Sequence, residues 1–220
     1  MKGEKKINKA KIFNLHCFPM DFARICCSPL LFFFRIKKLY VTPVAKKKIR
    51  GGAIIASNHT RFLDPLMLCA AFWYRRMFYL TANTVMSNKT IKFLLKKLGC
   101  IEINREICDI NSIRQTVTLL KSGQVISIFP QGGISRDDNM DSIKSGIVLM
   151  AMQAKVPIIP VYMHHKVKPK NQNCIVIGEP IPAFGSEDLP LIKDINSYAD
   201  YVLKKMTECK TIFESSRRDQ

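Results

Sequence analysis

From residue 52 onward, short apolar runs alternate with amphipathic stretches. Apolar runs of a few residues bounded by turn residues predict strands, and apolar positions spaced three or four residues apart predict helices. The pattern predicts strands near 53–57, 77–82, 100–104, 124–129, 157–163 and 174–178. It predicts helices near 65–75, 88–98, 111–122, 143–154 and 194–210.

Two of these runs, "QVISIFP" (124–130) and "VPIIPVY" (156–162), are nearly continuous in apolar residues, as strands covered on both faces require. The alternation of strands and helices predicts an α/β fold with a mixed, largely parallel sheet flanked by helices. With 220 residues, 47% of them hydrophobic, the chain can bury one substantial core. We therefore expect one α/β domain over residues 51–220 and an N-terminal appendage over residues 1–50.

The first fifty residues differ from the rest in charge. The chain has a formal net charge of +18, and this segment holds thirteen Lys and Arg residues against Glu4 and Asp21. Such a block attracts a polyanion, either a nucleic acid or an anionic lipid surface. Between the charges, residues 11–41 carry large apolar side chains and lack the regularly spaced aromatic pattern of a single-strand binder. We therefore expect an anionic membrane surface as the partner, and no nucleic acid.

The longest uncharged run of this segment, residues 25–34, is about half of the roughly 20 residues that a membrane-crossing helix needs. The segment is therefore predicted to lie in the membrane interface. Pro19 and Pro29 suit first-turn helical positions, which predicts two short helices joined near residue 28. A helical hairpin packed on the protein's own core is the alternative. No small-residue cleavage site follows the apolar run, so we expect no signal peptide.

One short stretch, "SNHTRFLDP" (57–65), places His59 five residues before Asp64. Residues five apart on one helix point about 140° apart, so the two side chains can meet only across a turn. Asp64-Pro65 is typical of a helix cap followed by proline in the first turn, which leaves His59 in the loop after a strand. There the carboxylate could fix the imidazole tautomer and stabilise the imidazolium. On spacing alone, such a pair is more often accidental than catalytic.

Three further segments change this interpretation. "GCIEINR" (99–105), "IFPQGGISR" (128–136) and "VPIIPVY" follow "NHTRFLD" in the order and approximate spacing of the four blocks of the glycerolipid acyltransferase family. That family includes the 1-acylglycerol-3-phosphate O-acyltransferases, and the chain resembles it from about residue 35 to residue 180. Four ordered blocks are far more specific than one.

The resemblance implies an α/β acyltransferase fold with an N-terminal two-helix membrane motif, at the cytoplasmic face of the cell membrane. It implies acyl-CoA or acyl carrier protein as the carrier of the donor thioester, and a lyso-lipid acceptor such as 1-acylglycerol-3-phosphate. It implies no cofactor and no metal. His59 would be the general base and Asp64 the residue that orients it. The acceptor hydroxyl would attack the thioester directly, in keeping with the absence of a G-x-S-x-G motif.

The candidate substrate-binding residues lie in the second and third blocks: Arg105, Gln131, Gly132, Gly133 and Arg136. The two glycines either form a nest-like turn, whose amides bind an anion, or a plain glycine turn. Arg105 and Arg136 are candidates for an acceptor phosphate, because a guanidinium binds two phosphate oxygens at once. The alternative is a solvated charge at a strand end for Arg105 and a surface charge for Arg136.

The third block departs from the family pattern. Where the family commonly has FPEGTRS, this chain has "FPQGGIS", with Gln131 for the glutamate, Gly133 for the threonine and Ile134 for the arginine. Asn83 occupies a position where the family often has lysine. Two cations expected near an acceptor phosphate are therefore missing. These changes leave open a different lyso-lipid acceptor, or a catalytically weakened lipid-binding relative.

Other reactive side chains carry less information. The eight cysteines form no C-x-x-C pair and no zinc-finger spacing, so most are expected to be small buried hydrophobes in a reducing cytoplasm. Lys144 is expected to be an exposed cation near a helix start. His164 and His165 end a predicted strand beside Lys166 and Lys168, without a carboxylate at useful local spacing. They are predicted to form a solvent-exposed edge without a catalytic role.

Overall fold

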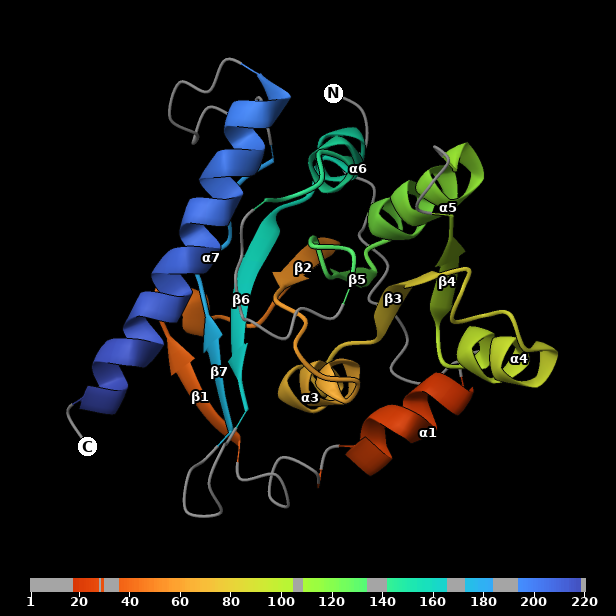
Figure 1. Ribbon diagram of the computed structural model, residues 1–220, viewed down its shortest axis with the longest axis horizontal. Coiled ribbons are helices and arrows are strands. Elements are labelled where there is room, and N and C mark those ends of the chain that lie inside the picture. Colours follow the sequence, from red (N-terminus) through yellow and green to blue (C-terminus); the bar gives the residue numbers. More distant parts are fainter. Residues whose placement is uncertain are drawn as a thin grey trace, which may run out of the picture.

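The computed structural model describes residues 18–27, 29, 36–104, 109–133, 142–165, 173–183 and 194–218. Within these residues seven strands form one mixed sheet in the order β1-β7-β6-β2-β5-β3-β4 (Figure 1). The predicted α/β class with a largely parallel sheet is confirmed. The strands are β1 (Ile36–Tyr40), β2 (Ala53–Ser57), β3 (Met77–Ala82), β4 (Cys100–Ile103), β5 (Val125–Ile128), β6 (Ile158–His164) and β7 (Asn173–Ile177). The helices are α1 (Phe18–Cys27), the short 3-10 helix η2 (Val44–Lys46), α3 (Asp64–Ala71), α4 (Lys89–Lys97), α5 (Ile110–Lys121), α6 (Gly146–Ala154) and α7 (Ile195–Arg218).

Five neighbouring strands, β6, β2, β5, β3 and β4, run parallel to one another. Strand β7 is antiparallel to β6, and β1 is parallel to β7. The five parallel strands end at one edge of the sheet, which we call the carboxyl edge, and begin at the opposite edge, the amino edge. Loops that follow β2, β5 and β6 therefore meet at the carboxyl edge, although they are far apart in sequence.

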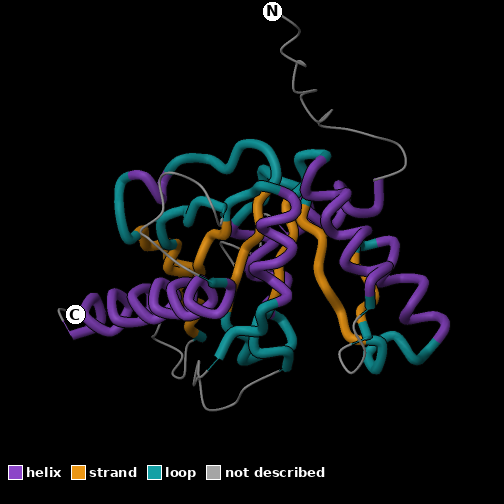
Figure 2. Tube along the Cα trace, turned by 90° about the horizontal axis from the view of Figure 1, so that it is seen from above, coloured by secondary structure: helices purple, strands orange, loops and turns teal. Residues whose placement is uncertain are grey.

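The two faces of the sheet bury alternate residues of the same strands. Ile54, Ile126 and Ile158 pack in one cluster with α5, α6 and α7, and α7 lies along β6 and β7 (Figures 1 and 2). Ile55 and Ile159 pack in a second cluster with α3 on the other face. The core therefore consists of two apolar layers with the sheet between them.

Most predicted elements are present, with shifts at their ends. The strands at 53–57 and 77–82 have the predicted bounds. Helix α3 ends at Ala71, four residues before the predicted end, and α7 continues to Arg218, eight residues beyond it. This extension is anchored by Phe213, whose ring packs against the rings of Tyr162 and His164.

Strand β1 was not predicted, and the helical interpretation of residues 11–41 is wrong for residues 36–40. This strand forms the edge of the sheet and pairs with β7. Lysines are common on edge strands because they discourage pairing with other chains. Here Lys37 and Lys38 gave the strand the composition of an interfacial helix. The folded α/β domain therefore begins before residue 50. Residues 28 and 30–35, where the second N-terminal helix was predicted, lie outside the described residues.

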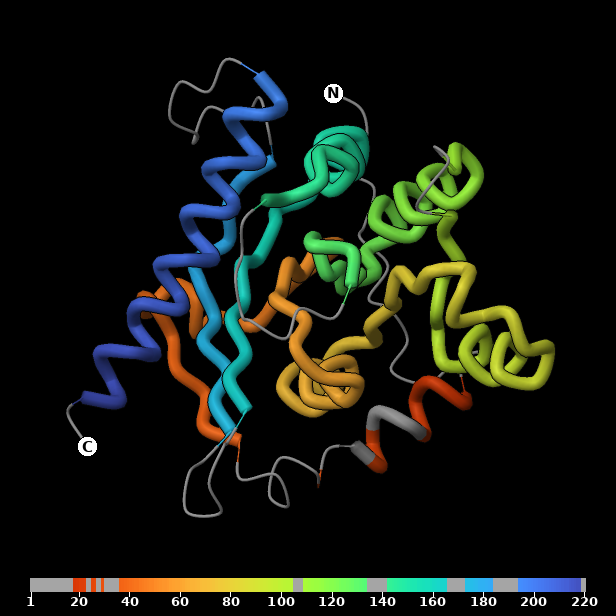
Figure 3. The backbone as a smooth tube through the Cα atoms, viewed as in Figure 1, coloured from red at the N-terminus to blue at the C-terminus, as the bar shows by residue number. Residues whose placement is uncertain are grey.

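Helix α1 is docked on the α/β domain and lies beside α3 and α4 (Figure 3). The buried carboxylate of Asp21 accepts two hydrogen bonds from Arg76, at 2.8 and 2.7 Å. On the outer side of the helix, the side chains of Phe18, Phe22 and Ile25 are exposed. None of the helices in the described part of the chain has both the length and the apolar character needed to cross a bilayer.

Candidate active site

The carboxylate of Asp64 is the centre of the polar cluster at the carboxyl edge. It is fully buried, and its Oδ2 accepts hydrogen bonds from His59 Nδ1 at 2.8 Å, the Thr60 amide at 2.8 Å and the Arg61 amide at 2.9 Å. Asp64 is the first residue of α3, and Leu63 occupies the N-cap position. The expectation that Asp64 caps its own helix was therefore wrong, because its carboxylate instead accepts the amides of the loop before α3.

The predicted contact between His59 and Asp64 across a turn is present. An ionised carboxylate only accepts hydrogen bonds, so Nδ1 of His59 carries the proton that it donates to Asp64. The imidazole ring stacks on the Phe129 ring, with centroids 4.1 Å apart, and its side chain is 15% exposed. This arrangement leaves Nε2, on the opposite edge of the ring, as the nitrogen that can accept a proton.

A second histidine binds the same carboxylate. His165 Nε2 donates to Asp64 Oδ1 at 2.5 Å, and the His165 side chain is only 9% exposed. The prediction of a solvent-exposed edge is wrong for His165. His165 and Asp64 are 101 residues apart in sequence, so local spacing could not predict this contact. Because β6 lies beside β2 and runs parallel to it, the residues that follow both strands reach the same point.

These hydrogen bonds keep Asp64 charged. Burial alone would raise the pKa of Asp64, but hydrogen bonds from His165, His59 and the Arg61 amide outweigh burial and hold the pKa well below its ordinary value. The site therefore holds a permanent anion at neutral pH, with an imidazole on each of its two oxygens.

Asn58 fixes the two strand ends that carry the histidines. Its side-chain amide donates to the Met163 carbonyl at 2.9 Å, and its side-chain oxygen accepts the Met163 amide at 2.7 Å. The ladder between β2 and β6 extends to the pair Ser57 and Val161, so this buried side chain continues the pairing beyond the backbone ladder. The sequence interpretation missed Asn58, because its role depends on which strand lies beside β2.

A cavity of about 450 Å³ opens beside His59 and extends over β3 towards α1. Its walls come from α3, β3, α4 and α1, so the cavity lies on the α3 face of the sheet. Most of the side chains that line it are apolar, including Met20, Leu66, Tyr79, Leu95, Leu98 and Phe129. A cavity with such walls suits a chain of methylene groups more than a polar ligand.

Comparison with known proteins gives the family. The acyltransferase family model matches residues 37–164. The chain belongs to the acyltransferase family. The predicted membership of the glycerolipid acyltransferases is thereby confirmed, and the protein is an O-acyltransferase.

Two relatives and one solved structure are similar to this acyltransferase. A 1-acyl-sn-glycerol-3-phosphate acyltransferase of Bacillus subtilis is 28% identical over 145 residues, which cover 64% of this chain and 72% of the relative. A probable enzyme of the same name from Mycoplasma genitalium is 29% identical over 132 residues, 57% of this chain and 49% of the relative. The crystal structure of the 1-acyl-sn-glycerophosphate acyltransferase PlsC from Thermotoga maritima has the same fold, with a TM-score of 0.64 at 16% identity. That similarity covers 90% of this chain and 80% of the PlsC chain.

The third block of this acyltransferase, which contains Gln131, Gly132 and Gly133, follows β5 at the carboxyl edge. Gly132 has a φ of 78°, and its amide donates to the Phe129 carbonyl at 3.0 Å. That amide is already engaged in the turn, which favours a plain glycine turn over the nest-like interpretation at Gly132. Gly133 lines the apolar cavity. A Cβ atom on Gly132 would lie 3.6 Å from Lys144 Nζ, which places this exposed cation over the turn.

Of the remaining predicted positions, Arg105, Ile134 and Arg136 lie outside the described residues. Among the described cysteines, Cys174 and Cys209 are buried as expected, and Cys26 is exposed. Within the described part of the chain, no group of three or more His, Cys, Asp or Glu side chains could hold a metal ion.

Proposed function

We propose that this acyltransferase moves a fatty acyl chain from an acyl thioester to a hydroxyl of a lysophospholipid, with 1-acylglycerol-3-phosphate as the first candidate acceptor. One observation carries the proposal. The Nδ1 atom of His59 is hydrogen-bonded to the buried, charged carboxylate of Asp64, and the His59 side chain lines an apolar cavity. The relatives, which are named 1-acyl-sn-glycerol-3-phosphate acyltransferases, support the choice of acceptor.

The geometry supports direct transfer in two proton steps. Nε2 of His59 takes the proton of the acceptor hydroxyl while the hydroxyl oxygen forms a bond to the thioester carbonyl carbon. The carbon–sulfur bond then breaks, and the imidazolium returns its proton to the thiolate that leaves. Asp64 stabilises the imidazolium between these steps and itself stays ionised. The products are the new ester and the free thiol of the carrier.

The acyl chain of the donor fits the cavity beside His59. Its volume of about 450 Å³ lies within the range of roughly 300–1,000 Å³ that small-molecule sites have. With the acyl chain in the cavity, the thioester lies at the end of the cavity next to His59, and the carrier stays outside. Both acyl-CoA and acyl carrier protein are compatible with this placement, so the experiment below tests both carriers.

Lys144 is the described cation best placed for an acceptor phosphate. It lies over the turn at Gly132 in the third block, the block in which the family commonly has an arginine and this chain has Ile134. Arg105 and Arg136 stay predicted phosphate ligands. Removing the Lys144 charge with Lys144→Gln should raise the KM for a phosphate-bearing acceptor more than it lowers kcat, because the contact forms in both the ground state and the transition state.

Membrane association is the second part of the proposal, at the cytoplasmic face of the cell membrane. Exposed apolar side chains lie on two helices that wall the cavity and in the loop before α3: Phe18 and Phe22 on α1, Phe93 on α4, and Phe62 in the loop. Phe18→Ser with Phe22→Ser should reduce sedimentation with lipid vesicles. Ile110→Ser is the matched control, because Ile110 is equally exposed but lies on α5, over the other face of the sheet.

The experiment is an acyl-transfer assay with purified protein, both carriers and a panel of lyso-lipids, with the products identified by mass spectrometry. We expect transfer to a lysophospholipid by the wild type, and none by a folded His59→Ala variant. Full activity in His59→Ala would overturn the mechanism. Absence of product with every wild-type combination, together with retained lipid binding, would instead favour a lipid-binding relative that has lost transfer.

A further inference from the structure

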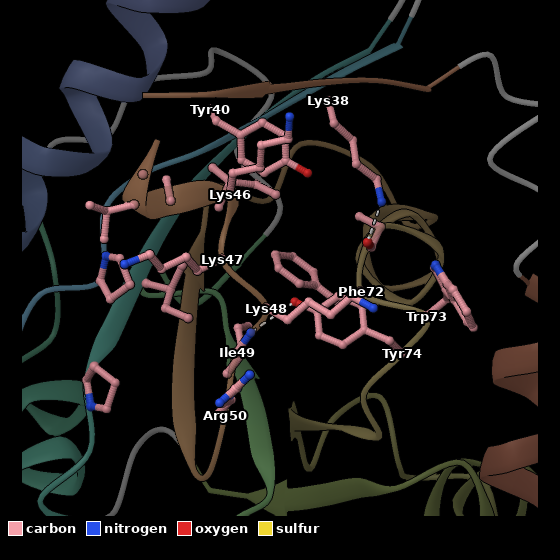
Figure 4. A pocket seen from close by; sticks show the side chains of 18 residues that line it. Lys38, Tyr40, Lys46, Lys47, Lys48, Ile49, Arg50, Phe72, Trp73 and Tyr74 are labelled. Carbon is pink, nitrogen blue, oxygen red and sulfur yellow. Dashed lines mark hydrogen bonds between the residues drawn. The ribbon is translucent and has the colours of Figure 1, made fainter. Parts of the chain in front are cut away.

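A second cavity lies at the amino edge of the sheet (Figure 4), and His59 is not one of the residues that line it. It has a volume of about 410 Å³ and lies on the α3 face. Its walls are the end of β1, the stretch of residues 46–50 before β2, and residues 72–74 after α3. We call it the amino-edge pocket.

Of the described residues, five basic side chains and no carboxylate line the amino-edge pocket: Lys38, Lys46, Lys47, Lys48 and Arg50. Lys38 is already engaged, because its Nζ donates to the Ala71 carbonyl at the end of α3, at 2.6 Å. Lys48 Nζ lies 5.7 Å from the centre of the Tyr74 ring. In the described part of the chain, Lys46, Lys47 and Arg50 are exposed and form no ion pair with a carboxylate. Among the described residues that line the pocket, no carboxylate offsets these positive charges.

The floor of the pocket is apolar. Ile159, Ile177 and Phe72 belong to the buried cluster of the α3 face and form its base. Tyr40 and Trp73 stand at the rim, and the Trp73 side chain is 51% exposed. Cations above an apolar floor, with exposed aromatic rings beside them, match a ligand that has an anionic head and an apolar body. Tryptophan and tyrosine are also the residues enriched at the membrane–water interface.

The amino-edge pocket is separate from the active site but lies on the same face of the sheet. Arg50 precedes β2 and His59 follows it, so the five residues of β2, about 17 Å of strand, lie between them. Helices α1 and α3 lie on the same face of the sheet as the pocket. A membrane that meets the exposed side chains of α1 can therefore also meet the amino-edge pocket.

We propose that the amino-edge pocket binds the phosphate headgroup of an anionic phospholipid in the membrane and so seats the enzyme at a second point besides α1. This inference rests on the proposed membrane association. Lys46, Lys47 and Lys48 contact the phosphate, and the glycerol part of the lipid lies on the apolar floor. A bare inorganic anion would leave that floor unused.

The chain offers a direct probe, because Trp73 is its only tryptophan. Tryptophan emission is measured while vesicles of phosphatidylcholine, with or without phosphatidylglycerol, are added to the full-length protein. We expect the emission to shift to shorter wavelength with vesicles that contain phosphatidylglycerol, and much less with phosphatidylcholine alone. Added salt should weaken the response, because exposed charges are screened.

The test variant combines Lys46→Gln, Lys47→Gln and Lys48→Gln. Its apparent affinity for the anionic vesicles should fall by about tenfold or more, because each cation near an anionic surface contributes separately. The matched control combines Lys121→Gln, Lys155→Gln and Lys204→Gln, which remove the same charge from α5, the end of α6 and α7 on the other face. The control should lose about twofold at most, and all three proteins should transfer acyl chains equally to a detergent-dispersed acceptor.

Three results would overturn the inference. Equal losses in both triple variants would show that binding follows net charge and not this pocket, and wild-type affinity in the test variant would remove the pocket from binding. A Trp73 response to inorganic phosphate that blocks the vesicle response would assign the pocket to free phosphate. Failure of the wild type to bind either kind of vesicle would overturn the membrane association itself, while the acyl-transfer assay would still test the chemistry.

Discussion

The two edges of the same sheet use charge in opposite ways. At the carboxyl edge, the Asp64 carboxylate is fully buried and accepts hydrogen bonds from two imidazoles and two amides. At the amino edge, Lys46, Lys47 and Arg50 are exposed and have no carboxylate beside them in the pocket they line. A proton transfer requires fixed positions, so its groups are paired and buried. A contact with a fluid anionic surface requires a positive electrostatic potential, so its charges stay exposed to solvent.

This difference predicts two kinds of response. Buried pairs are screened little by salt, whereas exposed charges lose most of their mutual interaction beyond a Debye length of about 10 Å at 0.1 M salt. Single substitutions at the carboxyl edge should therefore have large effects that salt does not change. Substitutions at the amino edge should have small, additive and salt-dependent effects.

Asp64→Asn should have the largest effect on the rate. The amide has the size of the carboxylate, but it lacks the charge that stabilises the His59 imidazolium and presents an NH₂ group to donors. We expect kcat to fall by about 10³-fold or more with donor affinity nearly unchanged. Steady-state kinetics and a donor-binding measurement check this, with Arg50→Gln as the amino-edge control. An Asp64→Asn enzyme with a rate close to that of the wild type would show that the buried anion is only structural.

His165→Leu should have the second largest effect. It removes one hydrogen bond to a charged group, an interaction of about 1.5–3 kcal/mol, so kcat should fall by roughly 10- to 100-fold while KM stays similar. His165→Gln, which can still donate to Asp64, should recover part of the rate. His164→Leu is the matched control, because the adjacent ring packs on Phe213 of α7 and lies outside the carboxylate cluster. Equal losses in both leucine variants would assign the effect to packing.

The parts of the site that the sequence predicted are those set by local contacts. His59 and Asp64 lie five residues apart, so a turn alone brings them together. His165 and Asn58 act through the pairing of β2 with β6, and sheet order follows from the packing of the whole chain. The regular period of apolar residues predicted the central strands correctly. It failed for β1, where half-buried lysines on an edge strand resemble an interfacial segment.

Asn58→Ala should affect stability more than any single change at the amino edge. It leaves the buried amide and carbonyl of Met163 without partners, which costs about 2–3 kcal/mol of unfolding free energy. Asn88→Ala is the control, because the exposed Asn88 side chain only caps α4 and its loss costs about 1 kcal/mol. Chemical denaturation of both variants measures the difference. Similar losses would mean that Asn58 does not clamp the strand ends.

Lys38→Met should have the smallest effect of these changes. It tests whether the behaviour of a charge depends on its place in the sheet or on having a hydrogen-bond partner. Lys38 lines the amino-edge pocket, yet it is half-buried and its ammonium donates to the last carbonyl of α3. Burial lowers the pKa of Lys38, so part of the hydrogen bond is offset by the cost of burying the charge. We expect Lys38→Met to lower the unfolding free energy by about 1 kcal/mol, because the Ala71 carbonyl loses its partner at a helix end. Lys46→Met, an exposed neighbour, should change it by about 0.5 kcal/mol at most. Denaturation at low and high salt tests both variants, and the Lys38 loss should persist in salt because its hydrogen bond is short and partly buried. If both lysines behave alike, the contrast between the edges follows position in the sheet; if only Lys38 matters, it follows whether each charge has a partner.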